Sequence, residues 1–228
     1  MHIFYQPDIS SGILSEEESL HAIKVLRLQV GDEIVIVDGV GGYNKAKITI
    51  PHHKHCGYEV YSSETNYGKR NYKLHIAISP TKNIERFEWF VEKAVEIGID
   101  EITPILCRYS ERKVIKSDRL EKIIVSASKQ SVKAFFTKLN PVTTFNDFVQ
   151  NNNVKGKFIA HCYPENKILL KNALEGHNDI VILIGPEGDF SLEEVELALQ
   201  NQFTPISLGE SRLRTETAGV VACVNVAH

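Results

Sequence analysis

A continuous apolar run, Asp179-Ile-Val-Ile-Leu-Ile184, most constrains the fold of this 228-residue chain. The run has no polar face, so it predicts a strand buried on both sides, as in parallel sheets that are covered by helices. The segment Ser191-Leu-Glu-Glu194 follows with the spacing of a capping box, which predicts that a short helix begins there. Residues 185–190 are therefore predicted to form a strand-to-helix turn.

The same order of elements recurs before the C-terminus. A second strand is predicted at residues 205–208, a loop at residues 209–214, and a closing helix at Thr215–Ala227. Ligands of parallel sheets bind at the carboxyl ends of the strands, where glycine lets the backbone approach closely. A single loop glycine usually serves only a turn. Two such loops that also carry charged residues indicate a ligand site. The charged residues in and beside these loops are Glu187, Arg212, Arg214 and Glu216.

The chain divides near residues 66–71. Short strand-like runs before this segment predict a small β-rich domain over residues 1–68. Strands and helices alternate after it, which predicts an α/β domain with a mainly parallel sheet over residues 72–228. The strands predicted in the first domain are Glu33–Val37 and residues 46–50 and 58–61. The elements predicted in the second are strands at residues 74–79 and 102–106, a helix at Ile84–Ile97, an apolar run at residues 157–162 and a helix near residues 167–174.

Positive charge is concentrated in one segment of a chain whose net charge is −3. Residues 108–138 hold nine Lys and Arg against three acids, a local charge of +6. A helix is predicted to start near Asp118, with Leu120, Ile124 and other apolar residues forming its buried stripe. Its basic face is expected to contact RNA phosphates. The cations of that face are Arg119, Lys122, Lys129 and Lys133, with Arg108 and Arg112 nearby.

Composition indicates a soluble protein without bound metal. The chain has no apolar stretch long enough to cross a bilayer and no signal-peptide pattern at its start, so we expect it in the cytoplasm. Its four cysteines are far apart and are expected to be reduced thiols. The segment His52-His53-Lys54-His55-Cys56 holds four potential ligands, but adjacent side chains rarely converge on one tetrahedral ion. A solvated turn is the expected structure there.

Several motifs together resemble the ribosomal RNA small subunit methyltransferase E family, which belongs to the SPOUT class of knotted methyltransferases. The two C-terminal loops carry Gly185-Pro-Glu-Gly188, Leu208-Gly209 and Arg212-Leu213-Arg214, followed by Thr215-Glu-Thr-Ala218. Near the N-terminus, His21-x-x-Lys-Val-Leu-Arg27 with Gly31-Asp32 is also similar to the family. One departure is Asp189, which stands where a second glycine is common. The resemblance spans essentially the whole chain.

The resemblance implies S-adenosylmethionine-dependent methylation of N3 of one uridine in 16S rRNA, either free or in the assembled small subunit. It also implies a homodimer, a small PUA-like β-barrel at the N-terminus and a trefoil knot, which general rules of chain connection would not predict. The cofactor contacts that it implies are Ile184, Gly185, Glu187, Gly188, Leu208, Gly209, Ser211, Leu213, Arg214, Thr217 and Ala218. The RNA contacts expected are Lys24, Arg27, Arg108, Arg112, Lys122, Lys129 and Lys133.

The implied reaction limits the roles of the charged residues. The N3 imide of uracil is a poor nucleophile until it loses its proton, so catalysis has to stabilise the anion or accept the proton. We expect Arg214, with Arg212 beside it, to stabilise the anion. Glu216 or Glu187 could accept the proton, but we expect these acids to pair with the two arginines.

Two other functions stay open from the sequence. A SPOUT enzyme could methylate the ribose 2′-hydroxyl of a tRNA or of 23S rRNA, although the N-terminal motif favours the N3-uridine family. The chain could also be a non-catalytic RNA-binding protein. A Rossmann-type methyltransferase is disfavoured, because the first strand of the α/β domain runs into Ser79-Pro-Thr-Lys82 without a glycine-rich turn.

Overall fold

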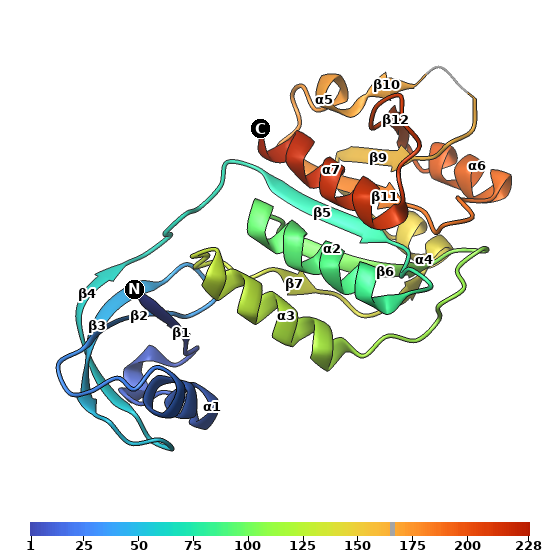
Figure 1. The fold of residues 1–228 in the computed structure, drawn as a ribbon. Coiled ribbons are helices and arrows are strands. Elements are labelled where there is room, and N and C mark those ends of the chain that lie inside the picture. Colours follow the sequence, from blue (N-terminus) through green and yellow to red (C-terminus); the bar gives the residue numbers. More distant parts are fainter. Residues whose placement is uncertain (165–166) are drawn as a thin grey trace. The chain divides into compact units, whose positions relative to one another are not determined.

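The computed structural model describes residues 1–164 and 167–228, which form two compact units (Figure 1). The N-terminal unit contains Met1–Lys69 and Val125–Phe136, and the C-terminal unit contains Arg70–Ile124 and Thr137–His228. The break at residues 69 and 70 falls within the predicted linker. The segment Val125–Phe136, however, packs with the N-terminal unit although it follows the linker in sequence.

The N-terminal unit is built on a four-stranded sheet of order β1-β2-β3-β4. The β1 strand runs parallel to β2, and the other neighbouring strands are antiparallel. The strands are β1 (His2–Tyr5), β2 (Glu33–Val37), β3 (Tyr43–Ile50) and β4 (Gly57–Glu64). The helical elements are η1 (Ile9–Ser11), α1 (Glu16–Leu20) and η2 (His21–Val25), the last of which is a π-helix.

The β2 strand explains why a distant segment joins this unit. Ile34 and Ile36 point into one apolar cluster, together with residues of β1, β3 and the helical elements. Val35 and Val37 point to the opposite face and pack with Ala134 in a second cluster. Because both faces of β2 are apolar, the sheet needs a cover on each side, and Val125–Phe136 supplies the second cover.

The C-terminal unit contains a parallel sheet of order β10-β12-β9-β11-β5-β6-β7, with β8 also pairing with β6. All of the described strand pairs in this sheet are parallel, which confirms the α/β prediction. The strands are β5 (Lys73–Ile78), β6 (Glu101–Leu106), β7 (Lys138–Leu139), β8 (Thr143–Thr144), β9 (Gly156–Ala160), β10 (Ile168–Leu169), β11 (Asp179–Ile184) and β12 (Thr204–Ser207). The helices are α2 (Ile84–Ile97), α4 (Phe145–Gln150), α5 (Leu170–Ala173), α6 (Leu192–Gln200) and α7 (Thr215–Ala227). The α3 helix (Ser117–Gln130) begins in this unit, and its residues from Val125 onward belong to the N-terminal unit.

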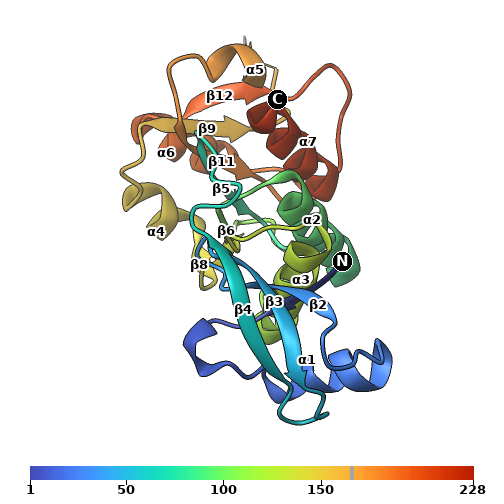
Figure 2. The same cartoon turned by 90° about the vertical axis from the view of Figure 1, so that its left-hand side faces the viewer.

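Helices cover both faces of the parallel sheet. The α2 and α7 helices pack against each other on one face, and α4 and α6 pack on the other, as both views show (Figures 1 and 2). The contact between α2 and α7 is close, because a Cβ atom on Gly219 would lie 2.5 Å from the Phe90 ring. The layers leave the carboxyl ends of the strands and the loops that follow them as the open edge of the sheet.

Most predicted elements are confirmed, and two helices are shorter than predicted. The helix predicted near residues 167–174 covers only Leu170–Ala173 (α5), because Ile168–Leu169 form the β10 strand instead. The β11 strand, the capping box at Ser191 and Glu194, and α2 have the predicted positions. The α3 helix ends at Gln130, so Lys133 does not share its face, and that part of the predicted basic face is wrong. No helix within residues 1–164 or 167–228 is long and apolar enough to span a bilayer.

Candidate functional site

The two glycine-bearing loops of the C-terminal unit enclose a cavity of about 720 Å³. The first loop lines it with residues 184–187 and Asp189, the second with residues 208–214, and α7 with its first turn. Residues 160–162, where β9 ends, form a third wall that the sequence patterns did not predict. The β9 strand lies between β11 and β12, so its carboxyl end must lie between the two loops.

Most of the predicted cofactor residues meet in this cavity. Gly188 and Thr217 are predicted cofactor contacts that do not line it, and neither does Glu216. Gly188 lies instead beneath Tyr109, because a Cβ atom on this glycine would be 3.1 Å from the Tyr109 Cβ. The predicted residues that line the cavity are Ile184, Gly185, Glu187, Leu208, Gly209, Ser211, Leu213, Arg214 and Ala218, together with Arg212.

Contacts within the C-terminal unit fix the first loop. The buried Thr215 hydroxyl at the start of α7 donates a 3.0 Å hydrogen bond to the carbonyl of Gly185. A carboxylate oxygen of Glu187 accepts a 2.9 Å hydrogen bond from the backbone N–H of Lys82. The start of α7 and the loop after β5 therefore both hold the 185–187 backbone in place. A preformed loop of this kind loses little conformational entropy when a ligand binds.

Asp189 links the first loop to the third wall. Its φ is +67°, in the left-handed region, so this position accepts a non-glycine residue. The carboxylate accepts 2.8 Å hydrogen bonds from the N–H groups of Phe190 and Cys162. Burial, followed by the charge of Asp189, raises the pKa of the Cys162 thiol. Asp189 therefore connects the end of β9 with the turn after β11.

The acids of the site do not pair with the arginines, and that prediction is wrong. Glu187 bonds to the backbone of Lys82. Glu216 is 7% exposed, and its Oε1 lies 3.8 Å from the Nε of Arg86, while its Oε2 has no hydrogen-bond partner in the described part of the chain. Within residues 1–164 and 167–228, neither Arg212 nor Arg214 forms an ion pair, and both are exposed. The two guanidinium groups are therefore available to a ligand.

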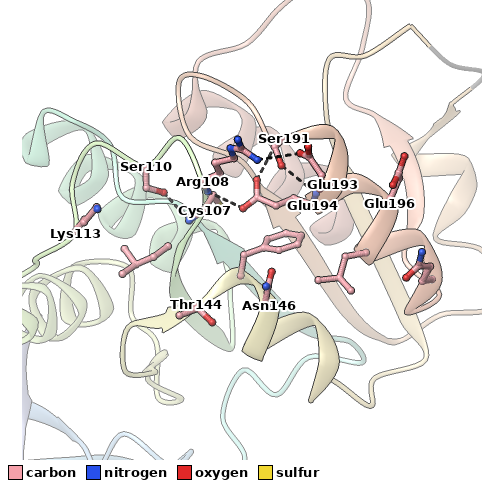
Figure 3. A pocket seen from close by; sticks show the side chains of 14 residues that line it. Cys107, Arg108, Ser110, Lys113, Thr144, Asn146, Ser191, Glu193, Glu194 and Glu196 are labelled. Carbon is pink, nitrogen blue, oxygen red and sulfur yellow. Dashed lines mark hydrogen bonds and ion pairs between the residues drawn. The ribbon is translucent and has the colours of Figure 1, made fainter.

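A second cavity, of about 710 Å³, lies at the carboxyl end of β6 beside the first turns of α4 and α6 (Figure 3). The Glu194 carboxylate accepts 2.8 Å hydrogen bonds from the N–H groups of Arg108 and Ser191. The Arg108 guanidinium lies 3.5 Å from Glu193. Because these polar groups serve helix capping and ion pairing, the first cavity is the better candidate for a ligand site.

Some of the predicted RNA contacts already bond to other groups of the protein, and others are exposed. Arg112 donates hydrogen bonds to the carbonyls of Thr81 and Lys82. Lys129 lies 2.6 Å from the buried Glu18 within the N-terminal unit. Both side chains therefore have structural roles that their sequence spacing did not reveal. Lys122 is exposed on α3 of the C-terminal unit, and Lys24 is exposed on η2 of the N-terminal unit. Arg27 follows η2 with a φ of +58°.

Comparison with known sequences places two family domains on this chain. The RNA methyltransferase domain family matches residues 68–227, and the RNA methyltransferase PUA domain family matches residues 14–56. The chain is 31% identical over 216 residues to the ribosomal RNA small subunit methyltransferase E of Buchnera aphidicola. That match covers 92% of this chain and 84% of the relative.

Solved structures resemble the whole chain. A probable rRNA methyltransferase from Porphyromonas gingivalis is 42% identical, with a TM-score of 0.92, and the match covers 98% of this chain and 96% of that one. A putative methyltransferase from Legionella pneumophila, solved with the bound cofactor SAM, is 27% identical with a TM-score of 0.87. That match also covers 98% of this chain and 96% of the other.

Proposed function

Since the chain belongs to the ribosomal RNA small subunit methyltransferase E family, we propose that it transfers a methyl group from S-adenosylmethionine to N3 of a uridine in 16S rRNA. The observation that carries this proposal is the cavity formed by the two motif loops, which presents the guanidinium groups of Arg212 and Arg214. Neither group forms an ion pair within the described residues. The substrate is the free rRNA or the assembled small subunit. A ribosomal substrate also places the enzyme in the cytoplasm.

The residues around this cavity fit S-adenosylmethionine. Ile184, Leu208 and Leu213 give it apolar walls suited to an adenine ring, and the loop backbones bring polar groups to the same space. Its lining also carries both signs of charge, from Glu187, Glu210, Asp189, Arg212, Arg214 and Lys167. Both signs suit a cofactor with a carboxylate, an ammonium and a sulfonium group. When bound there, the cofactor would supply an electrophilic methyl group to a nucleophile aligned with the sulfur–methyl bond, and the neutral thioether S-adenosylhomocysteine would be the leaving group.

Arg214 is the residue that we assign to the reacting uridine. It is exposed and directly precedes the first residue of α7, with an extended backbone (φ −73°, ψ 156°). A uracil that loses its N3 proton carries negative charge on the ring, and a fixed guanidinium stabilises that charge. The positive end of the α7 dipole adds to the same effect. We assign Arg212, exposed on the same loop, to support this role.

Glu216 fits the role of a general base poorly. Its carboxylate is buried next to Arg86 and does not line the cavity. Proton transfer requires the base to reach the N3 proton directly or through one water. We therefore assign the loss of the proton to solvent assisted by Arg214, and Glu216→Gln should keep kcat within about twofold of wild type, since a missing general base typically costs 10²- to 10⁴-fold.

The first experiment identifies the product. Small ribosomal subunits and free 16S rRNA from a strain that lacks the modification are incubated with the protein and S-adenosylmethionine, and the nucleosides are analysed by mass spectrometry. N3-methyluridine is the expected product. Ribose 2′-O-methylation would instead support the alternative SPOUT activity. The absence of any methylated nucleoside, with no cofactor binding by calorimetry, would support a non-catalytic RNA-binding protein.

The second experiment tests Arg214. Arg214→Ala should lower kcat by about 10²-fold, as the loss of one transition-state donor does, while the Kd for S-adenosylmethionine changes less. Arg214→Lys should restore part of the rate. Lys155→Ala is the control, because this exposed cation precedes the amino end of β9, at the opposite edge of the sheet. Equal losses in kcat and cofactor affinity for Arg214→Ala would mean that the arginine only binds the cofactor.

Three structural features complete the proposal. We propose that the C-terminal unit forms a trefoil knot, which is supported by the contact of Thr215 with Gly185 and by the packing of α7 on α2. The N-terminal sheet would form part of a small PUA-like β-barrel. The active form would be a homodimer, for which Trp89 on α2 and Val224 on α7 provide exposed apolar side chains. Light scattering of wild type and Trp89→Glu tests the dimer.

A further inference from the structure

Three histidine rings gather at the turn between β3 and β4 in the N-terminal unit. The ring centroids of His52 and His53 are 4.8 Å apart, and those of His52 and His55 are 5.6 Å apart with their planes within 7° of parallel. His52 and His55 are exposed, and His53 is half-buried. The predicted solvated turn is therefore also a stack of imidazoles, which we call the histidine cluster.

The backbone of this turn is fixed to the core of its unit. The buried N–H of Cys56 donates a 2.9 Å hydrogen bond to the hydroxyl of Ser19. The carbonyl of Cys56 accepts a 2.9 Å hydrogen bond from Leu14. Within the turn, the N–H of Lys54 donates to Nδ1 of His52 at 3.3 Å. The rings are thus held on a preformed support, which reduces the entropy lost when they bind a partner.

Charged groups from two other elements face the cluster. The positive charges of Lys24, on η2, and of Lys54, in the turn itself, act on His53, as does the negative charge of Glu16 on α1. Glu16 is already engaged, because its carboxylate lies 3.9 Å from the Lys54 ammonium. The two lysines and one glutamate give a net charge of +1 with neutral histidines. Each protonated histidine adds one charge, and protonation of His52 breaks the hydrogen bond that its Nδ1 accepts from Lys54.

The net charge of this surface changes with pH through the protonation of its histidines. Loss of water contact, followed by the charges of His52, Lys24 and Lys54, lowers the pKa of His53. A phosphate placed against the cluster would act in the opposite direction, because an anion favours the imidazolium form. No group of three potential ligands within the described residues is arranged to hold a metal ion. An anion is therefore the partner that the charges of this surface favour.

We propose that the histidine cluster and Lys24 bind the phosphate backbone of the rRNA substrate, and that protonation of the histidines strengthens this contact. The cluster lies within the segment that matches an RNA methyltransferase PUA domain. Phosphates attract the cations, and exposed imidazole rings can stack on unpaired bases. The inference rests on the proposed function in that it takes the substrate to be RNA. It adds a pH-dependent contact, far in sequence from the methyl-transfer loops.

The test compares RNA binding at two pH values. A fluorescently labelled 16S rRNA fragment is titrated with wild type and with the triple variant His52→Gln, His53→Gln, His55→Gln, at pH 6 and pH 8 and at several salt concentrations. The matched control, His177→Gln with His228→Gln, changes two exposed histidines of the C-terminal unit. Thermal unfolding at both pH values checks that every variant is folded.

Wild type should bind RNA on the order of tenfold more tightly at pH 6 than at pH 8. Its salt slope should be steeper by about 1.4, because two imidazolium–phosphate contacts on a single strand release about 0.7 counterion each. The control should behave like wild type, and the triple variant should lose most of both changes. Equal pH dependence in wild type and the triple variant would overturn the inference, and so would loss of the pH effect on addition of EDTA, which would indicate a metal site.

The two proposals fail in different ways. Methylation of small subunits at pH 8 with no pH-dependent RNA binding would refute only the role of the histidine cluster. A pH-dependent RNA contact that the triple variant loses, in a protein that methylates no RNA, would refute only the proposed enzyme activity.

Discussion

Replacing Asp189 with glycine should weaken cofactor binding, although glycine is the residue that best tolerates its backbone conformation. The φ of +67° costs a non-glycine residue roughly 1 kcal/mol, which glycine would recover. The carboxylate, however, accepts 2.8 Å hydrogen bonds from Phe190 in the first loop and from Cys162 in the third wall. Glycine removes both, so that the Tyr163 hydroxyl, which donates a 2.8 Å hydrogen bond to the Phe190 carbonyl, becomes the main remaining side-chain link between the two walls.

The balance of these effects gives the size of the change. A hydrogen bond to a charged group contributes about 1.5–3 kcal/mol, which partial exposure of Asp189 reduces to about 1 kcal/mol each. Glycine also adds about 0.5–1 kcal/mol of backbone entropy to be lost on ordering. After the recovered strain is subtracted, the net loss is about 1.5–2 kcal/mol. Because the loop lines the cavity, this loss sets an upper limit of about 30-fold on the increase in the Kd for S-adenosylmethionine.

Isothermal titration calorimetry measures this Kd for wild type, Asp189→Gly and Asp189→Asn. The asparagine variant keeps one acceptor oxygen and should fall between the other two. Gln202→Gly is the matched control, because Gln202 has a φ of +68° in the turn after α6 and does not line the cavity. It should relieve the same strain and leave the Kd unchanged. Cofactor binding by Asp189→Gly that is as tight as in wild type would refute this account.

Two further predictions concern stability. Burial lowers the pKa of His75 to about 4, so the unfolded chain takes up a proton between about pH 6.5 and 4 that the folded chain does not. The free energy of unfolding, measured with urea, should therefore be constant above pH 6.5 and fall by up to about 3 kcal/mol by pH 4. His75→Gln should reduce this dependence on pH. An unchanged pH dependence in the variant would exclude His75 as its source. Gly219→Ala should destabilise the protein by about 1–3 kcal/mol in the same assay, because the added Cβ would lie 2.5 Å from the Phe90 ring. A gain in stability, as expected from helix propensity alone, would show that α2 and α7 can separate at little cost.

Local patterns predicted the elements around the site well. The run at β11, the capping box before α6 and the apolar stripe of α2 all occur where the sequence placed them. Each depends on residues within a few positions of one another, so periodicity and capping chemistry are sufficient. The N-terminal elements were predicted less completely. The β1 strand pairs in parallel with β2, and its four residues alone gave too short a pattern to detect.

The partners of the charged residues could not be predicted from the sequence. Lys129 was predicted to contact RNA, yet it lies 2.6 Å from Glu18, which is 111 residues away in the sequence. Glu216 was expected beside Arg212 and Arg214, yet the helical turn places it beside Arg86. Hydrogen bonds and ion pairs of this kind depend on which elements pack together, and spacing within one element does not contain that information.

The sequence by itself determined the longer strands next to the site, the capped helix after β11 and the two glycine-bearing loops, because these follow from the chemistry of neighbouring residues. Only the tertiary structure placed β9 between β11 and β12, which made residues 160–162 the third wall of the cavity and gave Asp189 its partner there. Strand order in a parallel sheet is set by burial of apolar faces across the whole unit. The composition of the site therefore became visible only when distant segments were packed together.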